Sequence, residues 1–425
     1  MKPLAGTRIL AVEQFGAGPY GSMFLADLGA EVVKVENGET GGDTARHIGP
    51  GLLGNADSEY FQTFNANKLS VTLDLKSADG RESLRRLAAT AEAIMNNLRG
   101  DQPEKLGLDY NSLAAVNPAV VCLHISAYGR DNERKAWPGY DFLMQAETGL
   151  MSLTGEPDGP PQRFGSSLID FMTGITGVLG LLSCIIHARQ TGKGCDVDVS
   201  LFDVAMHQLS YPGTWHINGG PMPSRLARSA HQSISPVQTV RTRDGWIYVM
   251  CMKEKDWETL ARLIGHPEQV ADARFATAAA RRQNRAELTH ALDEAMRERT
   301  TAEWLQILTG HLPVGPVYDV AQAVANPFVE TVGMVRTVPH PAKPDFRMLA
   351  NPLKIDGERL EQTVCSALGA DNEALLTRAP VIPEAEPQAR LSGTSINESN
   401  SRGPGSEHRS PPAPGAPSGM TGRSA

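Results

Sequence analysis

The chain has few cysteines, and none of them form a closely spaced pair. Five occur in 425 residues, and no Cys-x-x-Cys spacing is present. The sequence therefore gives no sign of a disulfide framework or of a metal site. Most of the five lie in apolar stretches, so we expect reduced thiols in the core, as is typical of a cytoplasmic protein. They are Cys122, Cys184, Cys195, Cys251 and Cys365.

An excess of positive charge is also missing. Lys and Arg number 40 against 48 Asp and Glu, which gives a formal net charge of −8. This balance argues against a nucleic-acid partner or an anionic membrane surface. It leaves room for a local basic pocket that binds a phosphorylated ligand. We expect the partners to be small molecules.

Long apolar runs are absent as well. The N-terminus continues straight into a predicted strand, with no signal-like segment. The most apolar stretch, Phe171 to Ile186, has 16 residues and is followed by His187, Arg189 and Lys193. A membrane span needs about 20 apolar residues. We therefore predict a buried core helix here and no membrane partner.

The pattern of strands and helices predicts an α/β protein. Apolar strands alternate with helical stretches from Arg8 to about Phe202, which indicates a Rossmann-like large domain with a mainly parallel sheet. The expected strands are 8–12, 31–35, 70–75, 93–95, 119–126 and 196–200. Four segments are predicted: residues 1–210 as the first part of the large domain, 224–330 as a smaller α+β domain, 331–380 as a return to the large domain, and 384–425 as a disordered Pro/Gly/Ser-rich tail.

Within the smaller domain, the sequence predicts a strand at 246–252 and helices near 257–264, 285–299 and 302–308. Gly315-Pro316 is expected to end the preceding regular structure before a last helix. A strand at 334–338 would begin the return to the large domain.

Two glycine-containing loops follow predicted strands, at Gly16–Gly21 and Asn96–Gly100. Parallel strands place such loops on one edge of the sheet, where ligands usually bind. The first loop, with Glu36 twenty residues on, also matches a dinucleotide fingerprint. Pro19 removes an amide that should bind the pyrophosphate. An NAD-dependent oxidoreductase is therefore kept as an alternative only.

One carboxylate, Asp170, stands at the head of the apolar helix. An Asp at a helix start is most often an N-cap. Here Gly174, Gly177 and Gly180 follow at every third position, and glycines of this kind are tolerated where another element approaches closely. The helix dipole and free amides favour a charged carboxylate at this place. Asp170 is therefore predicted to be an ionised nucleophile.

Together these residues resemble the class III (CaiB/BaiF) CoA-transferases, of the formyl-CoA:oxalate CoA-transferase type. The resemblance extends from Pro3 to about Leu376 and depends on the order of many short motifs. They are Pro3–Gly6, Gly18-Pro19, Asp27–Glu36, Gly42-Asp43 with Arg46, Asn65-x-Asn67-Lys68, Leu73–Lys76, Asn97, Leu106–Leu108, Gly139–Asp141, Asp170, Thr191–Gly194 and Gly315–Val317.

The resemblance implies a catalytic role for Asp170 and an interlocked homodimer. It implies that CoA, as a thioester substrate, lies along Gly16, Ala17, Leu73, Asp74, Leu75, Lys76, Asn97, Leu98, Lys105, Pro138, Gly139, Tyr140 and Asp141. Lys76 and Lys105 would contact phosphates. No tightly bound cofactor and no metal are implied. Asn37-Gly38 departs from the Arg or Arg-Pro usual after Glu36, which puts one contact to the CoA nucleotide in doubt.

The implied reaction moves CoA from a donor such as succinyl-CoA to a carboxylic acid, through an aspartyl anhydride and an aspartyl-CoA thioester. The glycine-rich loop of oxalate enzymes is missing near Met252–Lys255, so we expect a larger acceptor such as a C4–C6 dicarboxylate. Arg46, Arg163 and His231 are candidates to hold its distal carboxylate. A 2-methylacyl-CoA racemase of the same family is the alternative, but it needs two bases, and His124 reads as a core residue.

Overall fold

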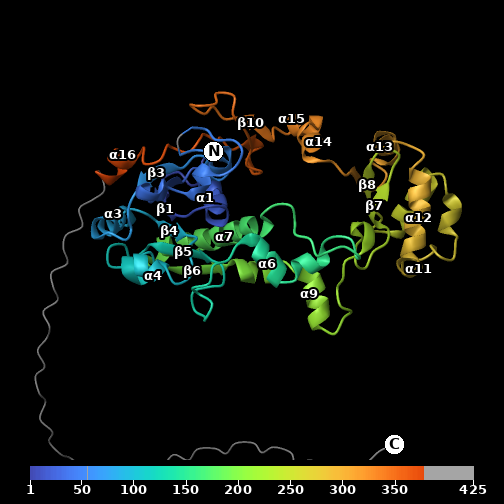
Figure 1. The fold of residues 1–425 in the computed structure, drawn as a ribbon, viewed down its shortest axis with the longest axis horizontal. Coiled ribbons are helices and arrows are strands. Elements are labelled where there is room, and N and C mark those ends of the chain that lie inside the picture. The colour runs from blue at the N-terminus through green and yellow to red at the C-terminus, as the bar shows by residue number, and fades with distance from the viewer. Residues whose placement is uncertain (55, 378–425) are drawn as a thin grey trace, which may run out of the picture. The chain divides into compact units, whose positions relative to one another are not determined.

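The computed structural model describes residues 1–54 and 56–377 (Figure 1). The predicted tail at 384–425 lies outside the described residues, as do the last positions of the predicted return at 331–380. The proposed domain boundaries stay predictions.

A six-stranded parallel sheet forms the centre of the first region. Its order is β3-β2-β1-β4-β5-β6, the arrangement of a Rossmann fold, and every neighbouring pair is parallel. All six strands were predicted from the sequence, with ends displaced by no more than a few residues. They are β1 (Arg8–Val12), β2 (Glu31–Glu36), β3 (Leu69–Thr72), β4 (Ala93–Asn96), β5 (Val121–Ser126) and β6 (Cys195–Ser200). The prediction of an α/β fold is confirmed.

Helices cover both faces of this sheet, because successive strand residues point to opposite sides. Ile9 and Ala11 of β1 pack with α1 (Ala17–Asp27), α7 (Leu168–Thr191) and α8 (Leu201–His207). Leu10 and Val12 pack on the other side with α3 (Ala78–Ala88), α4 (Pro103–Leu106) and α5 (Tyr110–Leu113). The central strands β1, β4 and β5 are therefore buried on both faces, which explains their largely apolar sequences.

The glycines of α7 permit close contacts, as predicted. A Cβ on Gly174 would lie 2.4 Å from the carbonyl oxygen of Ala17, and one on Gly21 would lie 2.7 Å from the carbonyl oxygen of Gly174. On Gly177 a Cβ would approach Leu123 and Val199 of the sheet to 3.2 and 3.3 Å. These glycines let α1 and α7 touch backbone to backbone while α7 lies on the sheet.

Helix α7 is longer than predicted, at 24 residues, and it has the length and composition of a membrane-spanning helix. The sequence prediction stopped it at Ile186, but the helix runs on to Thr191 and ends at Gly192, whose φ of 71° is left-handed. Ile169, Val178, Leu181 and Ile185 are buried in the core beneath the sheet. The prediction of a core helix is confirmed for this face only, because Leu179 is 66% exposed.

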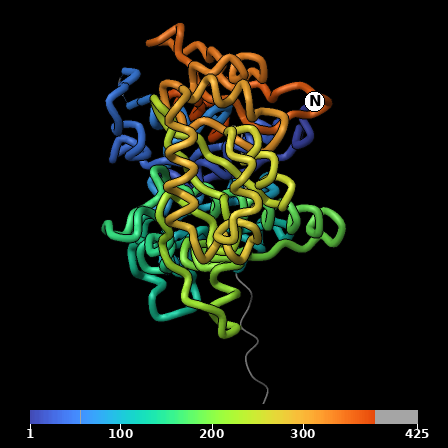
Figure 2. Tube along the Cα trace, turned by 90° about the vertical axis from the view of Figure 1, so that its right-hand side faces the viewer, coloured from blue at the N-terminus to red at the C-terminus, as the bar shows by residue number. Residues whose placement is uncertain are grey.

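Residues 237–316 build a second sheet with its own apolar core. Strands β7 (Val237–Arg241), β8 (Trp246–Met250) and β9 (Val314–Pro316) are antiparallel. Helices α10 (Glu254–Leu263), α11 (Ala278–Gln283), α12 (Arg285–Met296) and α13 (Thr301–Leu308) accompany them, and they face the viewer in Figure 2. Gly315-Pro316, predicted as a stop, instead belongs to β9, where Pro316 pairs at the edge of the sheet.

The last described segment returns to the first sheet. Strand β10 (Val335–Thr337) was predicted and pairs with β11 (Arg347–Leu349). Helix α16 (Asn372–Leu376) contacts β3, where the side chains of Asp371 and Asn372 accept hydrogen bonds from the amides of Ser70 and Thr72, both at 2.8 Å.

The remaining elements are short and connect these layers. They are η1 (Gly38–Thr40), η2 (Thr44–His47), α2 (Glu59–Asn65), α6 (Asp141–Glu147), η3 (Leu150–Leu153), α9 (Ser210–Ile217), η4 (Ala227–Ser229), η5 (Pro267–Val270), α14 (Val320–Val324), α15 (Pro327–Thr331), β12 (Lys354–Ile355) and β13 (Glu358–Arg359).

Candidate active site

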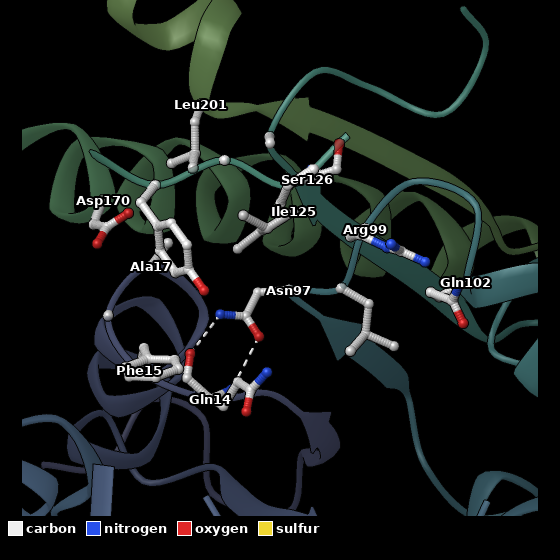
Figure 3. A pocket seen from close by; sticks show the side chains of 16 residues that line it. Gln14, Phe15, Ala17, Asn97, Arg99, Gln102, Ile125, Ser126, Asp170 and Leu201 are labelled. Atoms are coloured by element: carbon white, nitrogen blue, oxygen red, sulfur yellow. Dashed lines mark hydrogen bonds between the residues drawn. The ribbon is translucent and has the colours of Figure 1, made fainter. Parts of the chain in front are cut away.

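A pocket of about 330 Å³ opens at the carboxyl ends of the central strands. The order of the sheet reverses between β1 and β4, and this is where ligands bind in open α/β sheets. Figure 3 shows Asp170 at one end of the pocket and Arg99 with Gln102 at the other. The lining residues are Gln14, Phe15, Gly16, Ala17, Asn97, Leu98, Arg99, Gln102, Ile125, Ser126, Ala127, Pro138, Gly139, Tyr140, Asp170 and Leu201.

The loops after β1 and β4 are joined by two reciprocal hydrogen bonds. The amide of Gln14 donates to Oδ1 of Asn97 at 2.9 Å, and Nδ2 of Asn97 donates to the carbonyl of Gln14 at 2.6 Å (Figure 3). The next residue, Phe15, has a left-handed φ of 61°. That conformation is uncommon for a residue other than glycine and carries strain. Its amide donates to Asp43 at 3.2 Å, which holds this turn in place.

Asp170 is the third residue of α7, and its carboxylate lies against the backbone of Gly16. A Cβ at Gly16 would fall 2.7 Å from Oδ2 of Asp170, so any larger residue at this position would displace the carboxylate. Among the described residues, no side chain or amide donates a hydrogen bond to the Asp170 carboxylate. It is therefore a carboxylate held at a pocket wall without a structural partner.

Capping of α7 is done by a different residue, Asp141. Its Oδ2 accepts hydrogen bonds from the amides of Ile169 at 2.6 Å and Asp170 at 3.0 Å, and its Oδ1 accepts from Gln145 at 2.5 Å. Asp141 is buried and begins α6. The interpretation of Asp170 as an ordinary N-cap is therefore wrong, because the side chain that accepts amides at the start of α7, those of Ile169 and Asp170, belongs to Asp141.

The environment raises the pKa of Asp170 to about 7. Burial makes the larger contribution, since a charged carboxylate loses hydration there, and the negative charge of Asp141 adds to it. The helix start was expected to favour the ionised form of Asp170, but burial and the neighbouring carboxylate of Asp141 outweigh that effect and raise its pKa. Asp170 titrates near neutrality instead, as functional carboxyl groups often do.

Beneath the pocket lies a network of fully buried ion pairs. Lys68 pairs with Glu13 at 2.8 Å and Lys34 with Asp43 at 2.9 Å, with every side chain 0% exposed. Burial acts to lower the pKa of Lys34, but the charges of Asp43, Glu13 and Glu36 outweigh it and raise that pKa. Lys34 also donates to the carbonyl of Glu13 at 2.9 Å. Lys68 also donates to the carbonyl of Pro19 at 2.9 Å, so both ends of the loop that bears Gly16 are tied to buried charges.

The dinucleotide interpretation fails at Glu36. Both of its oxygens are occupied by Arg46, at 2.8 and 2.9 Å, and further bonds come from the amide of Asp43 and the hydroxyl of Ser70. These bonds, with Lys34, outweigh burial and lower the pKa of Glu36 to about 2. A buried and saturated carboxylate cannot accept the ribose hydroxyls of NAD. The same contacts rule out the predicted role of Arg46 in holding the acceptor's carboxylate. Its side chain is 0% exposed and paired with Glu36.

The structure brings eight of the fourteen predicted site residues into the pocket: Gly16, Ala17, Asn97, Leu98, Pro138, Gly139, Tyr140 and Asp170. The other six, Leu73, Asp74, Leu75, Lys76, Lys105 and Asp141, do not line it. Lys105 is paired with Asp101 at 2.7 Å, while Lys76 is exposed. The side chain of Leu73 is buried in the core. Contacts of these residues with CoA stay predictions.

The remaining candidates lie outside the pocket. Arg163 is stacked 4.0 Å over the ring of Phe142, and His231 faces the hydroxyl of Tyr211 at 3.2 Å. His124 is buried between Asn96 and Asp196, at 2.9 Å from each, which confirms it as a core residue. Within the described ranges, no group of three His, Cys, Asp or Glu side chains could hold a metal ion.

Sequence reasoning missed eight lining residues: Gln14, Phe15, Arg99, Gln102, Ile125, Ser126, Ala127 and Leu201. Gln14, Ser126 and Leu201 stand within two residues of the ends of β1, β5 and β6, so the strand pattern held the signal needed to find them. Arg99 is the basic side chain in the lining. Its guanidinium lies 3.3 Å from Asp101 and is half exposed.

The chain matches the model of CoA-transferase family III over residues 4–372. It is 34% identical over 338 residues to a succinate–glutarate CoA-transferase of Agrobacterium fabrum, covering 78% of this chain and 84% of the relative. It is 32% identical over 357 residues to an acetyl-CoA:oxalate CoA-transferase of Acetobacter aceti, covering 84% and 90%.

A crystal structure of a CaiB/BaiF family protein from Brucella suis superimposes with a TM-score of 0.78 at 33% identity, covering 89% of this chain and 99% of that one. The match to the family model, over residues 4–372, includes the sheet, the Asp170 pocket and the second region. The chain belongs to CoA-transferase family III.

Proposed function

We propose that this CoA-transferase works through a covalent intermediate on Asp170. The observation that carries the proposal is the position of Asp170: a carboxylate without a structural partner, at the wall of the pocket and against the backbone of Gly16. Moving CoA between acids needs a group that keeps the acyl unit activated and away from water. A carboxylate does this, because its mixed anhydride is as activated as a thioester.

The proposed cycle has four attacks. The carboxylate of Asp170 attacks the carbonyl carbon of the donor thioester, the C–S bond breaks, and CoA leaves as the thiolate. The thiolate attacks the Asp170 carbonyl of the anhydride, releasing the donor acid and leaving an aspartyl-CoA thioester. The acceptor carboxylate then attacks this thioester and expels the thiolate again. Attack of the thiolate on the acceptor carbonyl gives the new acyl-CoA and frees Asp170.

Backbone amides near Asp170 are suited to stabilise the tetrahedral oxyanions of these steps. Ala17 and Gly18 are the first residues of α1, so their amides have no acceptor inside the helix. Gly16 brings this helix start directly against the Asp170 carboxylate. One such donor contributes about 3 kcal/mol to transition-state stabilisation in comparable sites.

For substrates, we propose succinyl-CoA or a similar acyl-CoA as donor and a C4–C6 dicarboxylate as acceptor. The succinate–glutarate relative supports this choice, whereas the oxalate relative marks the main rival. With Arg46 buried and Arg163 and His231 outside the pocket, Arg99 is the basic side chain of the lining that can meet an anionic group. An acid–base racemase has less support, since no histidine lines the pocket.

We further propose that two copies form an interlocked dimer. Large apolar side chains are exposed on several elements of the single chain: Leu179 at 66%, Ile186 at 58%, Ile217 at 79%, Val320 at 80% and Phe328 at 65%. Such side chains, spread over α7, α9, α14 and α15, are typical of surfaces covered by a partner.

The covalent mechanism predicts that Asp170→Ala abolishes transfer, with a loss of at least about a thousandfold in kcat, because the nucleophile is removed. In wild type, hydroxylamine added during turnover should form a hydroxamate on Asp170, identified by peptide mass spectrometry. Asp131→Ala, which removes an exposed carboxylate outside the pocket, serves as the control. Modification at another residue, or turnover by Asp170→Ala, would contradict the mechanism.

The raised pKa of Asp170 predicts a pH dependence. The carboxylate must be ionised to attack, so kcat/KM should rise with pH through about 7 and then level off. Asp141→Asn retains an oxygen that can accept the amides of α7 but removes the negative charge, which should lower the pKa of Asp170 and move the acid limb to lower pH. Asp131→Asn is the control. An identical limb in all three proteins would exclude Asp170 as the titrating group.

The substrate proposal is tested with a panel of acids and CoA donors. Succinate, glutarate, mesaconate, oxalate and propionate are offered with succinyl-CoA and with acetyl-CoA, and the CoA esters are identified by mass spectrometry. We expect the C4–C6 dicarboxylates to be favoured at least tenfold in kcat/KM. A preference for oxalate or propionate would overturn the acceptor assignment while leaving CoA transfer intact. Deuterium exchange at the α-carbon of 2-methylacyl-CoA, without transfer, would favour the racemase.

The dimer is tested by subunit exchange. Two preparations with different affinity tags are mixed under native conditions and captured on one tag. An interlocked dimer should give no hybrid until the mixture is denatured and refolded together, because the chains cannot separate while folded. Rapid hybrid formation, or a monomeric mass in light scattering, would show that the chains are not interlocked.

A further inference from the structure

A second hollow, of about 490 Å³, lies at the turn between β7 and β8 and the end of α12. None of its lining residues takes part in the Asp170 pocket. Four of the six carry a guanidinium, a concentration that stands out in a chain with a net charge of −8. The lining residues are Arg228, Arg241, Thr242, Arg243, Trp246 and Arg297.

Positive charge in this hollow is only partly neutralised. Arg228 pairs with Asp293, and Arg243 lies 3.2 Å from Glu303 in a half-exposed pair. Within residues 1–54 and 56–377, the guanidiniums of Arg241 and Arg297 have no carboxylate partner. The two guanidiniums without a carboxylate partner leave the hollow positively charged, and an anion from outside would be attracted to it.

The hollow is also held in a fixed shape. The guanidiniums of Arg228 and Arg241 both lie against the indole ring of Trp246, at 4.6 and 4.8 Å from its centre. Asp293, 6% exposed, receives Arg228 on one oxygen and the backbone amide of Arg241 on the other, at 2.8 Å. These contacts fix the two arginines before any ligand arrives.

One donor in this cluster is left without an acceptor. The Nη1 atom of Arg228 is buried and has no hydrogen-bond partner among the described residues. A buried, unsatisfied donor on a charged group is unfavourable. The observation that points to an anion with several oxygens is the unpaired charge of Arg241 and Arg297 beside two further guanidiniums.

We propose that this hollow binds a small molecule that carries at least two phosphate charges. Guanidiniums bind phosphate oxygens through paired N–H groups, and several arginines around one hollow match an anion of multiple charge. Its volume is in the range of small-ligand sites. The site is independent of the Asp170 chemistry. Its phosphate belongs either to a free phosphorylated metabolite or to the nucleotide end of a CoA molecule.

The test is calorimetric titration of the full chain with inorganic pyrophosphate at constant ionic strength. We expect one saturable site per chain in wild type. The double variant Arg241→Ala/Arg297→Ala should bind at least tenfold more weakly. Lys255→Ala/Arg262→Ala removes the same charge from exposed positions of α10 that have no partner among the described residues, and should bind as wild type does. Arg297→Ala alone replaces the double variant if that protein does not fold.

Absence of saturable binding to wild type would overturn the proposal, as would equal weakening in both double variants. A second titration with adenosine 3′,5′-bisphosphate separates the two sources of phosphate. If it binds the hollow at least tenfold more tightly than pyrophosphate, in a manner lost with Arg241 and Arg297, the site receives the nucleotide end of CoA. Equal affinities assign it to free phosphorylated metabolites. Asp170→Ala should leave both titrations unchanged, whether or not the covalent mechanism holds.

Discussion

The pocket depends on ion pairs that are fully buried, where a charged group loses its hydration. Lys68 has no exposed surface, and its ammonium lies within 2.9 Å of four acceptors: Glu13, the carbonyls of Pro19 and Phe64, and Asn65. Removing one member of a buried ion pair typically destabilises a protein by about 3–5 kcal/mol, because its partner is left uncompensated. The network ties both ends of the loop from Glu13 to Pro19 to buried lysines. The left-handed turn at Phe15 and the approach of Gly16 to Asp170 lie within this loop.

Two neighbouring carboxylates divide two roles between them. Asp141 accepts three hydrogen bonds and caps α7, whereas Asp170 receives none from the described residues and faces the pocket. The capping charge is also what adds to the raised pKa of Asp170. A single carboxylate could not fill both roles at once, because bonding to the helix amides would leave it less free to act as a nucleophile.

Much of this arrangement follows from sequence, and its limits have physical causes. The central strands were predictable because both of their faces are buried, so apolar runs mark them. Gly174 and Gly177 predicted a close contact that the structure shows. Which long charged side chains pair with one another does not follow from the periodicity of the sequence. Lys34, Asp43 and Arg46 meet across loops, so Arg46 looked available for a substrate when it is enclosed by Glu36. The cap on α7 comes from a residue 28 positions away from Ile169, which no local pattern reveals.

The outer edge of β3 has a consequence for synthesis of the chain. The amides of Ser70 and Thr72 are satisfied by Asp371 and Asn372, which lie 301 and 300 positions later. An open strand edge is a template for pairing with other chains. During translation this edge emerges long before the residues that cover it. Until they are synthesised, the nascent sheet has an unpaired strand edge. Chains released before these last contacts would be the ones most exposed to aggregation.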